Sequence, residues 1–375
     1  MSGFTNIPSP GLKAAALDFA PGPLIRCVCA LMICITHLSG LVWYRVGMTG
    51  PGQDIFLPTT TYMFFTKTGA VAFLMLAGAA LVPRAEMGIT AYLSRRLRRW
   101  LPSILFAQAL YLGWNLGAGR LSPSSLSWFD LLAPAHYHLW FFYAIGLIYV
   151  AVVPMQWYAR QAETVLGRGR VVALALPLVP PVAMMITMAF RGGAWGDLTL
   201  ANLVIYCGYA WTGYLLARHP AKTCWPGAVL VVLGIAATIL TTIILSEATG
   251  IPERRFMHRC WLGIGCLAVG QFMLLQQLDR RITAPAIRAR IARLGKLTLG
   301  VFIIHPLLLT VLGWPHAWIA HRPSAWIDLP LAGIALFAAS ALIVSAYFGL
   351  AAHLPFVPVA WRGGGNHRPL RANGV

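Results

Sequence analysis

The chain has 375 residues, of which 58% are hydrophobic and only 10% are charged, and its formal net charge is +19. A soluble globular domain carries roughly 25% charged residues, so this chain lacks the polar residues that would cover a water-exposed surface. The composition therefore excludes an ordinary soluble protein and indicates an integral membrane protein.

Apolar runs of about 17–25 residues follow one another along nearly the whole chain, without the two-residue alternation of a half-buried strand. Runs of this length cross a bilayer as helices, because a helix satisfies its backbone hydrogen bonds internally. The sequence predicts an all-α fold, a polytopic membrane helix bundle of about ten transmembrane helices. The predicted spans cover residues 24–45, 61–83, 100–118, 138–159, 171–190, 199–217, 225–246, 260–278, 297–314 and 328–353.

The basic residues predict the orientation of these spans, because cytoplasmic loops carry an excess of lysine and arginine. With the N-terminus inside, most basic residues fall in alternate, cytoplasmic connections, and both termini are cytoplasmic. The charge then lies beside the membrane lipid and is spread over several loops, so we expect no nucleic-acid partner. The expected segments are a cytoplasmic N-terminal segment 1–23, a membrane domain 24–355 and a cytoplasmic C-terminal tail 356–375.

The seven cysteines point to neither a disulfide framework nor a metal centre. Most of them lie within apolar runs, and none forms a CxxC pair. No cluster of histidines has the spacing of a zinc site. We therefore expect buried thiols and no bound metal.

The first span carries two polar residues, Arg26 and His37, that a lipid-facing helix would avoid. Eleven residues bring a helix almost back to the same face, so both side chains project from one side, about 16 Å apart along the axis. One interpretation is structural: Arg26 reaches back to the interface and His37 hydrogen-bonds a neighbouring helix. The other is catalytic, because a neutral imidazole in a dry bundle can act as a general acid–base.

A second basic group stands at the entry to the third span, in the stretch SRRLRRWLP. Arg95 and Arg98 are three residues apart, as are Arg96 and Arg99, so on a helix each pair shares a face. Guanidinium groups bind phosphate in a bidentate manner. An ordinary inside-positive anchor explains the same residues without a ligand.

Histidines and aromatic residues mark the start of the fourth span. His136 and His138 precede Trp140 and Tyr143 at the junction of an outer loop with the span. An aromatic belt at the membrane interface accounts for this pattern. Two histidines at this spacing are weak evidence for a metal site.

The ninth span contains His305, followed at once by Pro306. A proline inside a helix frees a backbone carbonyl and can kink the span, which opens room for a polar pocket. His305 is therefore a site candidate, although packing alone would also explain it.

Taken in order, these four groups resemble the membrane acyltransferase 3 family. The shared features are Arg-x10-His in the first span, Arg-Arg-x-Arg-Arg-x-x-Pro at the third, His-Leu-Trp-Phe-Phe-Tyr at the fourth and Ile-Ile-His-Pro near the end. The resemblance covers about residues 20–360. The chain departs from the family in the run AFLMLAGAAL, where Ala77 stands at the position of a frequent serine.

The resemblance implies an integral membrane O-acyltransferase of the bacterial inner membrane. It would transfer an acyl group, with acetyl expected, from cytoplasmic acyl-CoA to a hydroxyl of an exopolysaccharide or another cell-envelope glycan. Polysaccharide-synthesis proteins are then possible partners. By that resemblance Arg26 and His37 are the essential pair, and Arg96 and Arg99, with Arg95 and Arg98 as support, contact the phosphates of acyl-CoA. We further predict that His305 joins Arg26 and His37 as a catalytic residue. The predicted substrate-orienting residues are His138, Trp140 and Tyr143.

The sequence leaves two choices open. His37 could act as a general base on the acceptor hydroxyl or could carry the acyl group covalently. A transporter or flippase for a glycan or small solute, and a non-catalytic subunit of a polysaccharide synthase, are alternatives to an enzyme, because intramembrane histidines also relay protons.

Overall fold

The computed structural model describes residues 22–44, 53–83, 88–191, 199–312 and 324–351. Every regular element in these ranges is helical, which confirms the predicted all-α bundle. The main helices are α2 (Pro23–Trp43), α3 (Gln53–Leu81), α4 (Ile89–Gly117), α5 (Trp128–Leu132), α6 (Trp140–Thr164), α7 (Arg168–Ala175), α8 (Val179–Arg191), α9 (Leu200–Arg218), α10 (Trp225–Ile235), α11 (Thr241–Thr249), α12 (Leu262–Arg281), α13 (Pro285–Leu312) and α15 (Ala325–Ala351).

Two of the expected spans are built from consecutive helical pieces. A short 3-10 turn, Leu176–Leu178, joins α7 to α8, and a π-helical segment, Ala236–Leu240, joins α10 to α11. Among the described residues, nine helical segments are long and apolar enough to cross a bilayer. They correspond to nine of the ten predicted spans.

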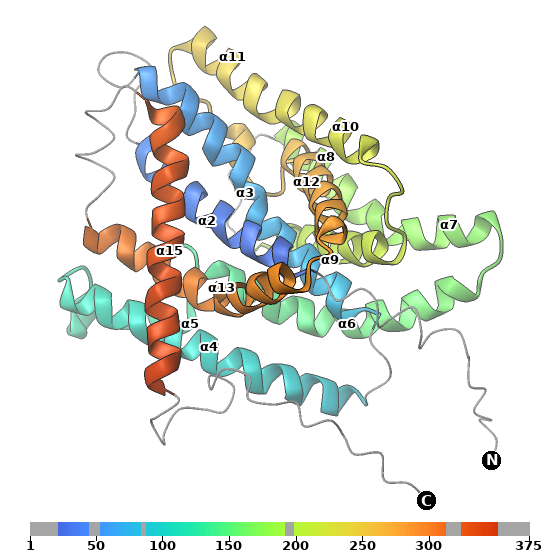
Figure 1. Ribbon diagram of the computed structural model, residues 1–375, viewed down its shortest axis with the longest axis horizontal. Coiled ribbons are helices and arrows are strands. Elements are labelled where there is room, and N and C mark those ends of the chain that lie inside the picture. Colours follow the sequence, from blue (N-terminus) through green and yellow to red (C-terminus); the bar gives the residue numbers. More distant parts are fainter. Residues whose placement is uncertain (1–21, 45–52, 84–87, 192–198, 313–323, 352–375) are drawn as a thin grey trace, which may run out of the picture.

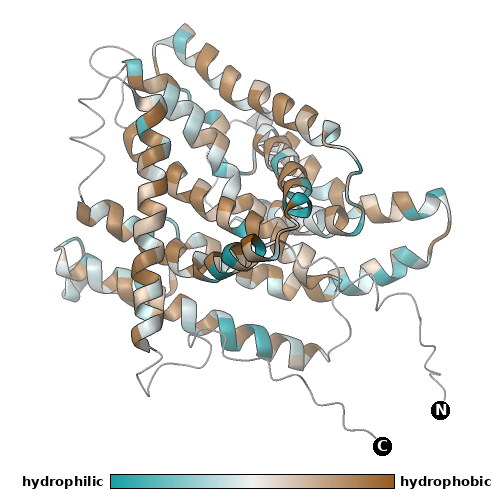
Figure 2. Ribbon diagram, in the orientation of Figure 1, coloured by the Kyte–Doolittle hydropathy of each residue, from teal (hydrophilic) through white to brown (hydrophobic). Residues whose placement is uncertain are grey.

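Helix α4 contains the remaining predicted span, at residues 100–118, and differs in character from the others. Its N-terminal half carries four arginines, and Ser103, Gln108 and Asn115 interrupt the apolar half. Figure 2 shows the hydrophilic stretch on this helix, whereas brown, hydrophobic colour dominates most of the bundle. These polar residues leave α4 outside the nine apolar spans, and two of them hold the loop described below.

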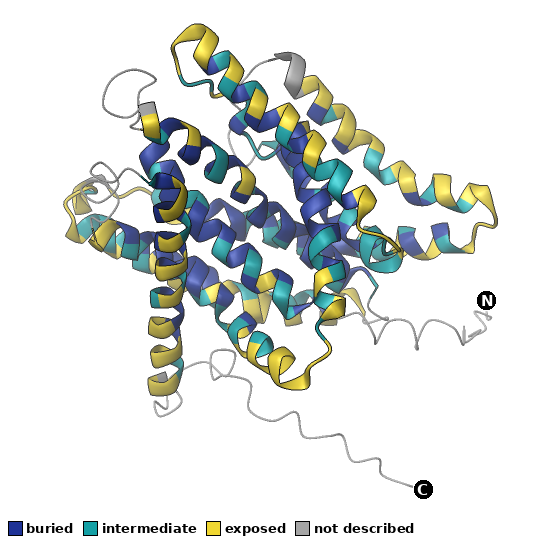
Figure 3. Ribbon diagram, turned by 45° about the horizontal axis from the view of Figure 1, so that its top comes forward, coloured by how far each residue is buried: buried dark blue, intermediate teal, exposed yellow. Residues whose placement is uncertain are grey.

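Helices α2 and α3 form the buried centre of the bundle (Figures 1 and 3). Two thirds of the most apolar window of each is buried, against 22% for the span Trp225–Thr249. Small residues let the helix backbones approach closely. A Cβ added to Gly69 would lie 2.7 Å from the carbonyl oxygen of Cys29, and one added to Gly78 would clash with the carbonyl of Ala210.

Candidate active site

Helices α2 and α13 bring together two histidines that are 268 residues apart in the chain. Nδ1 of His37 lies 2.6 Å from Nε2 of His305. The two rings are nearly parallel, with centroids 4.8 Å apart. His305 is fully buried and His37 is half-buried. The structure thus joins two residues that the sequence proposed separately, from the first and the ninth spans.

The hydrogen bonds of this pair define which nitrogen carries a proton. Nδ1 of His305 lies 2.9 Å from the carbonyl oxygen of Val301, and a carbonyl only accepts, so Nδ1 carries the hydrogen. In neutral His305 the other nitrogen, Nε2, is then a bare acceptor, and Nδ1 of His37 donates to it. Neutral His37 is left with an unprotonated Nε2. We assign this tautomer from the hydrogen-bond partners, and it is the form that a general base requires.

A second histidine pair, from the loop before α6, lies beside the first. Nδ1 of His136 is 2.7 Å from Nδ1 of His138, so one of the two donates to the other. The ring of His138 lies 5.9 Å from that of His305 and 6.3 Å from that of His37, centroid to centroid. Only 1% of His138 is exposed, and its Nε2 is buried without a hydrogen-bond partner in the described structure. Of the expected substrate-orienting residues, His138 is thus the one that faces the central pair.

Tyr111 of α4 supports both pairs. Its ring stacks on His136 at 4.4 Å and meets His138 edge-on at 4.9 Å. Its hydroxyl donates to the carbonyl oxygen of Ile303, two residues before His305, at 2.7 Å. Tyr111 therefore ties the loop histidines to the turn of α13 that carries His305.

The polar residues of α4 fix the loop that carries His136 and His138. The side-chain amide of Gln108 donates to Ala133 O at 2.6 Å and accepts from the backbone N–H of Ala135 at 2.8 Å. The amide of Asn115 donates to Ala135 O at 3.0 Å. Backbone groups of a loop that lose contact with water require such partners. The residues that make α4 less apolar thus position the loop next to His37.

Trp140 and Tyr143 have other partners in this structure. The Tyr143 hydroxyl donates to the carbonyl oxygen of Leu132, at the end of α5, which holds the start of the loop. The guanidinium carbon of Arg259 lies 3.7 Å from the centre of the Trp140 ring, a cation–π contact. Both residues border the site without facing the His37–His305 pair.

Cations surround the histidine cluster. Lys67 of α3 and Arg259 lie near enough to interact electrostatically with His37, and Arg120 does so with His136. Burial, with Arg120 acting in the same direction, lowers the pKa of His136 to about 4. Burial and the neighbouring histidines also place the pKa of His138 well below its usual range. The two loop histidines are therefore neutral at neutral pH.

Arg26 lies at the opposite end of α2 from His37 and is exposed. Eleven residues of helix separate the two side chains by about 16 Å along the axis, as the spacing predicts. The neighbouring Cys27 contacts the carbonyl oxygen of Ile291 in α13, which places this end of α2 against the first turns of α13.

The four arginines of α4 occupy its N-terminal half, and only Arg96 is partly buried. Its guanidinium carbon lies 5.4 Å from the centre of the Tyr92 ring, and its Nε is buried without a partner in the described residues. Trp100 docks this part of α4 on α6 through a 2.9 Å hydrogen bond to Phe142 O. The arginines form a mostly exposed cationic face on this half of α4.

Within the described ranges, no three histidine, cysteine or acidic side chains are arranged to hold a metal ion.

Several residues of the site have no distinct signal in the sequence. Tyr111, Lys67 and Arg259 could not be singled out from the sequence, because each looks like an ordinary span or loop residue. The polar interruptions of α4 were the one signal that could have linked that helix to the site.

Comparison with known families agrees with this geometry. The model of the acyltransferase domain family, acyltransferase 3, matches residues 17–361, nearly the whole chain. No curated protein and no solved structure gives a significant match. The match includes all four motif regions and every helix described above. This chain is therefore a multi-pass membrane protein of the acyltransferase 3 family, and the family supports an acyltransferase activity.

Proposed function

We propose that the protein is an O-acyltransferase of a bacterial inner membrane that moves an acyl group, with acetyl expected, from cytoplasmic acyl-CoA to a hydroxyl of an exopolysaccharide or another envelope glycan. The observation that carries this proposal is the His37–His305 pair. It leaves an unprotonated nitrogen on His37 within a buried cluster of histidines.

In the proposed reaction, Nε2 of His37 takes the proton of the acceptor hydroxyl while the hydroxyl oxygen attacks the thioester carbonyl. The tetrahedral intermediate collapses, the C–S bond breaks, and the imidazolium returns the proton to the leaving thiolate. Lys67 and Arg259 lie close enough to favour the negative charge of that intermediate. His305 keeps Nδ1 of His37 protonated throughout, in the manner of the third member of a catalytic triad.

The donor is proposed to enter from the end of α2 that carries Arg26. Arg96 and Arg99, with Arg95 and Arg98 as support, would contact the phosphates of acyl-CoA. Arg26 would guide the pantetheine arm along α2, whose eleven intervening residues span about 16 Å. This route keeps the nucleotide at one side of the membrane and the acceptor at the other.

His138 is proposed to bind the acceptor hydroxyl. Whichever of the two loop histidines donates, Nε2 of His138 is a buried donor or a buried acceptor without a partner. A hydroxyl both donates and accepts, so it satisfies this nitrogen in either case. Trp140 and Tyr143 would then orient the substrate indirectly, through the loop that they border.

The direct test is acyl transfer by purified protein in nanodiscs with radiolabelled acetyl-CoA and the surface glycan. His37→Ala should lose transfer by about 1000-fold while still binding acetyl-CoA, because general-base catalysis contributes about 10²–10⁴-fold. Transfer at the parental rate would overturn the proposal. A wild-type protein that does not bind acetyl-CoA would favour a transporter. An acyl group that stays on the wild-type protein, but not on His37→Ala, would indicate the covalent route.

A further inference from the structure

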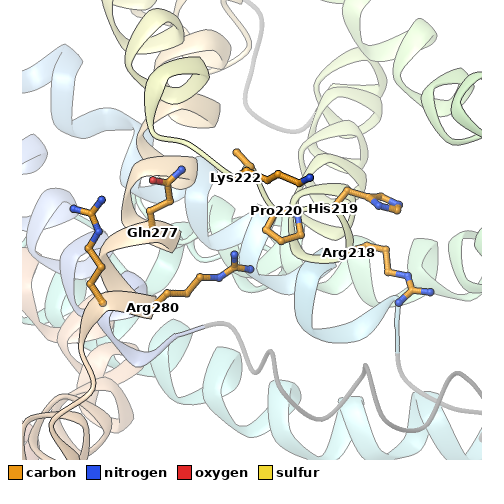
Figure 4. Close-up of a pocket in the computed structure, with 8 residues that line it drawn as sticks. Arg218, His219, Pro220, Lys222, Gln277 and Arg280 are labelled. Atoms are coloured by element: carbon orange, nitrogen blue, oxygen red, sulfur yellow. The ribbon is translucent and has the colours of Figure 1, made fainter.

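A basic cleft lies apart from the histidine cluster, where the end of α9, the α9–α10 connection and the last turns of α12 meet. It is an open cleft of about 700 Å³. Figure 4 shows Lys222 and Arg280 on opposite walls, with Pro220 between them. The cleft is lined by Arg218, His219, Pro220, Ala221, Lys222, Gln277, Arg280 and Arg281.

The lining carries four permanent cations and no carboxylate. The nearest acids neutralise only part of this charge. Glu163 pairs with Arg218 at 3.0 Å and accepts a hydrogen bond from Tyr214. Asp279 interacts electrostatically with Arg288 and Arg280, and its carboxylate lies against the backbone at the start of α2. Within the part of the chain that the structure describes, these two carboxylates are partly engaged elsewhere and leave the four cations of the lining in excess.

The positive-inside rule explains an excess of basic residues on one side of a membrane. It does not explain why four of them line a single cleft. Like charges that line a low-dielectric cavity repel one another and focus the field on an anion that enters. Guanidinium forks and lysine ammonium groups are the side chains that bind phosphate. The volume falls within the range of about 300–1,000 Å³ that is usual for small-molecule sites.

The cleft also neighbours the donor end of α2. Asp279, next to Arg280, packs so closely on Gly22 that a Cβ there would clash with its carboxylate. Gly22 stands four residues before Arg26 and immediately before the first residue of α2. A ligand in the cleft would therefore lie at the same end of the bundle as Arg26.

We propose that this cleft binds the phosphate groups of an anionic ligand. Two sources have this chemistry: the nucleotide end of acyl-CoA and the headgroup of an anionic phospholipid. The first source rests on the function proposed above, with this cleft and the arginines of α4 sharing the phosphates of acyl-CoA, and the second source does not rest on it. Lys222 and Arg280 are the residues that would contact the phosphates.

The test uses full-length protein in phosphatidylcholine nanodiscs, with coenzyme A titrated by calorimetry. For the first source, Lys222→Ala/Arg280→Ala should raise the Kd for coenzyme A at least fivefold. The control, Arg160→Ala/Arg168→Ala, removes the same charge at the same end of the bundle but outside the cleft. It should change the Kd by less than twofold. Equal changes in both variants would exclude coenzyme A as the cleft ligand.

Native mass spectrometry with added phosphatidylglycerol is the second arm. For the lipid source, the cleft variant should lose bound phosphatidylglycerol that the wild type and the control retain, with its Kd for coenzyme A unchanged. A cleft variant that matches the control in both arms overturns the proposal. His37→Ala separates this result from the proposed catalytic function, because it should abolish transfer and leave both binding measurements unchanged.

Discussion

The two ends of helix α2 differ in how completely their polar groups are satisfied. Near one end, His37 is hydrogen-bonded to His305, which is itself bonded to Val301, and the second histidine pair packs against them. At the other end, Arg26 is exposed, and the arginines of α4 and the basic cleft lie at the surface. The histidine cluster is thus held together by contacts among its own side chains, whereas the other end presents exposed cations to solvent.

The largest effect among the supporting residues is expected at His305. His305→Ala should lower the rate of transfer on the order of 100-fold, because Nδ1 of His37 loses its acceptor and the reactive tautomer is no longer fixed. His305→Gln places an amide oxygen near the former Nε2 and should recover at least tenfold of that loss. Steady-state transfer rates measure both. Equal rates for the two variants would show that His305 only fills space.

At the cationic end, we expect an effect on binding and not on chemistry. Arg96→Ala/Arg99→Ala should raise the KM for acyl-CoA about tenfold and leave kcat within about twofold, because the phosphate contacts act alike in the ground and transition states. Arg160→Ala/Arg168→Ala supplies the matched charge control. A fall in kcat with unchanged KM would contradict the assignment of these arginines to the donor.

The half-buried loop histidine His136 predicts a pH dependence of stability. A histidine in the unfolded chain has a pKa of about 6.5, whereas burial lowers the pKa of His136 to about 4. Between these values the unfolded chain binds more protons, so the free energy of unfolding decreases as the pH falls from 6.5 toward 4. Thermal unfolding scans in detergent should show this decline. The decline should be shallower in His136→Asn, and an equal slope in both proteins would count against a neutral His136 in the folded protein.

The smallest effect is expected at Tyr143, which borders the site without facing it. Tyr143→Phe removes the hydrogen bond to Leu132 O, which is worth about 1 kcal/mol of stability. Transfer should fall only a few-fold, through a looser loop, and the KM for acyl-CoA should stay constant. A loss comparable to that of His305→Ala would mean that Tyr143 touches the substrate directly.

Much of the fold could be predicted from the sequence, because bilayer thickness dictates the length of an apolar helix. Helix α4 shows the limit of that argument. Gln108 and Asn115 weaken its apolar signal because they bind loop backbone around Ala135, a tertiary contact that no local pattern reveals. The orientation of the termini and the three-segment division remain predictions.

The sequence could predict those site residues that are polar within an apolar span, as His37 and His305 are. It could not predict that these two side chains contact each other, because helix packing decides which of many spans meet. Tyr111 could not be recognised, since a tyrosine in a membrane helix needs no special reason. The basic cleft was hidden for a related cause: its cations come from two separate connections, and each alone fits the positive-inside rule.

The most direct measurement of the central claim is a count of O-acyl groups on the surface glycan by solution NMR. Cells that carry the wild-type protein would be compared with cells that carry His37→Ala at equal protein abundance in the membrane. The account predicts that one O-acyl signal of the glycan disappears in the His37→Ala strain and that the polymer itself is still made and exported. An unchanged acyl content in that strain would contradict it.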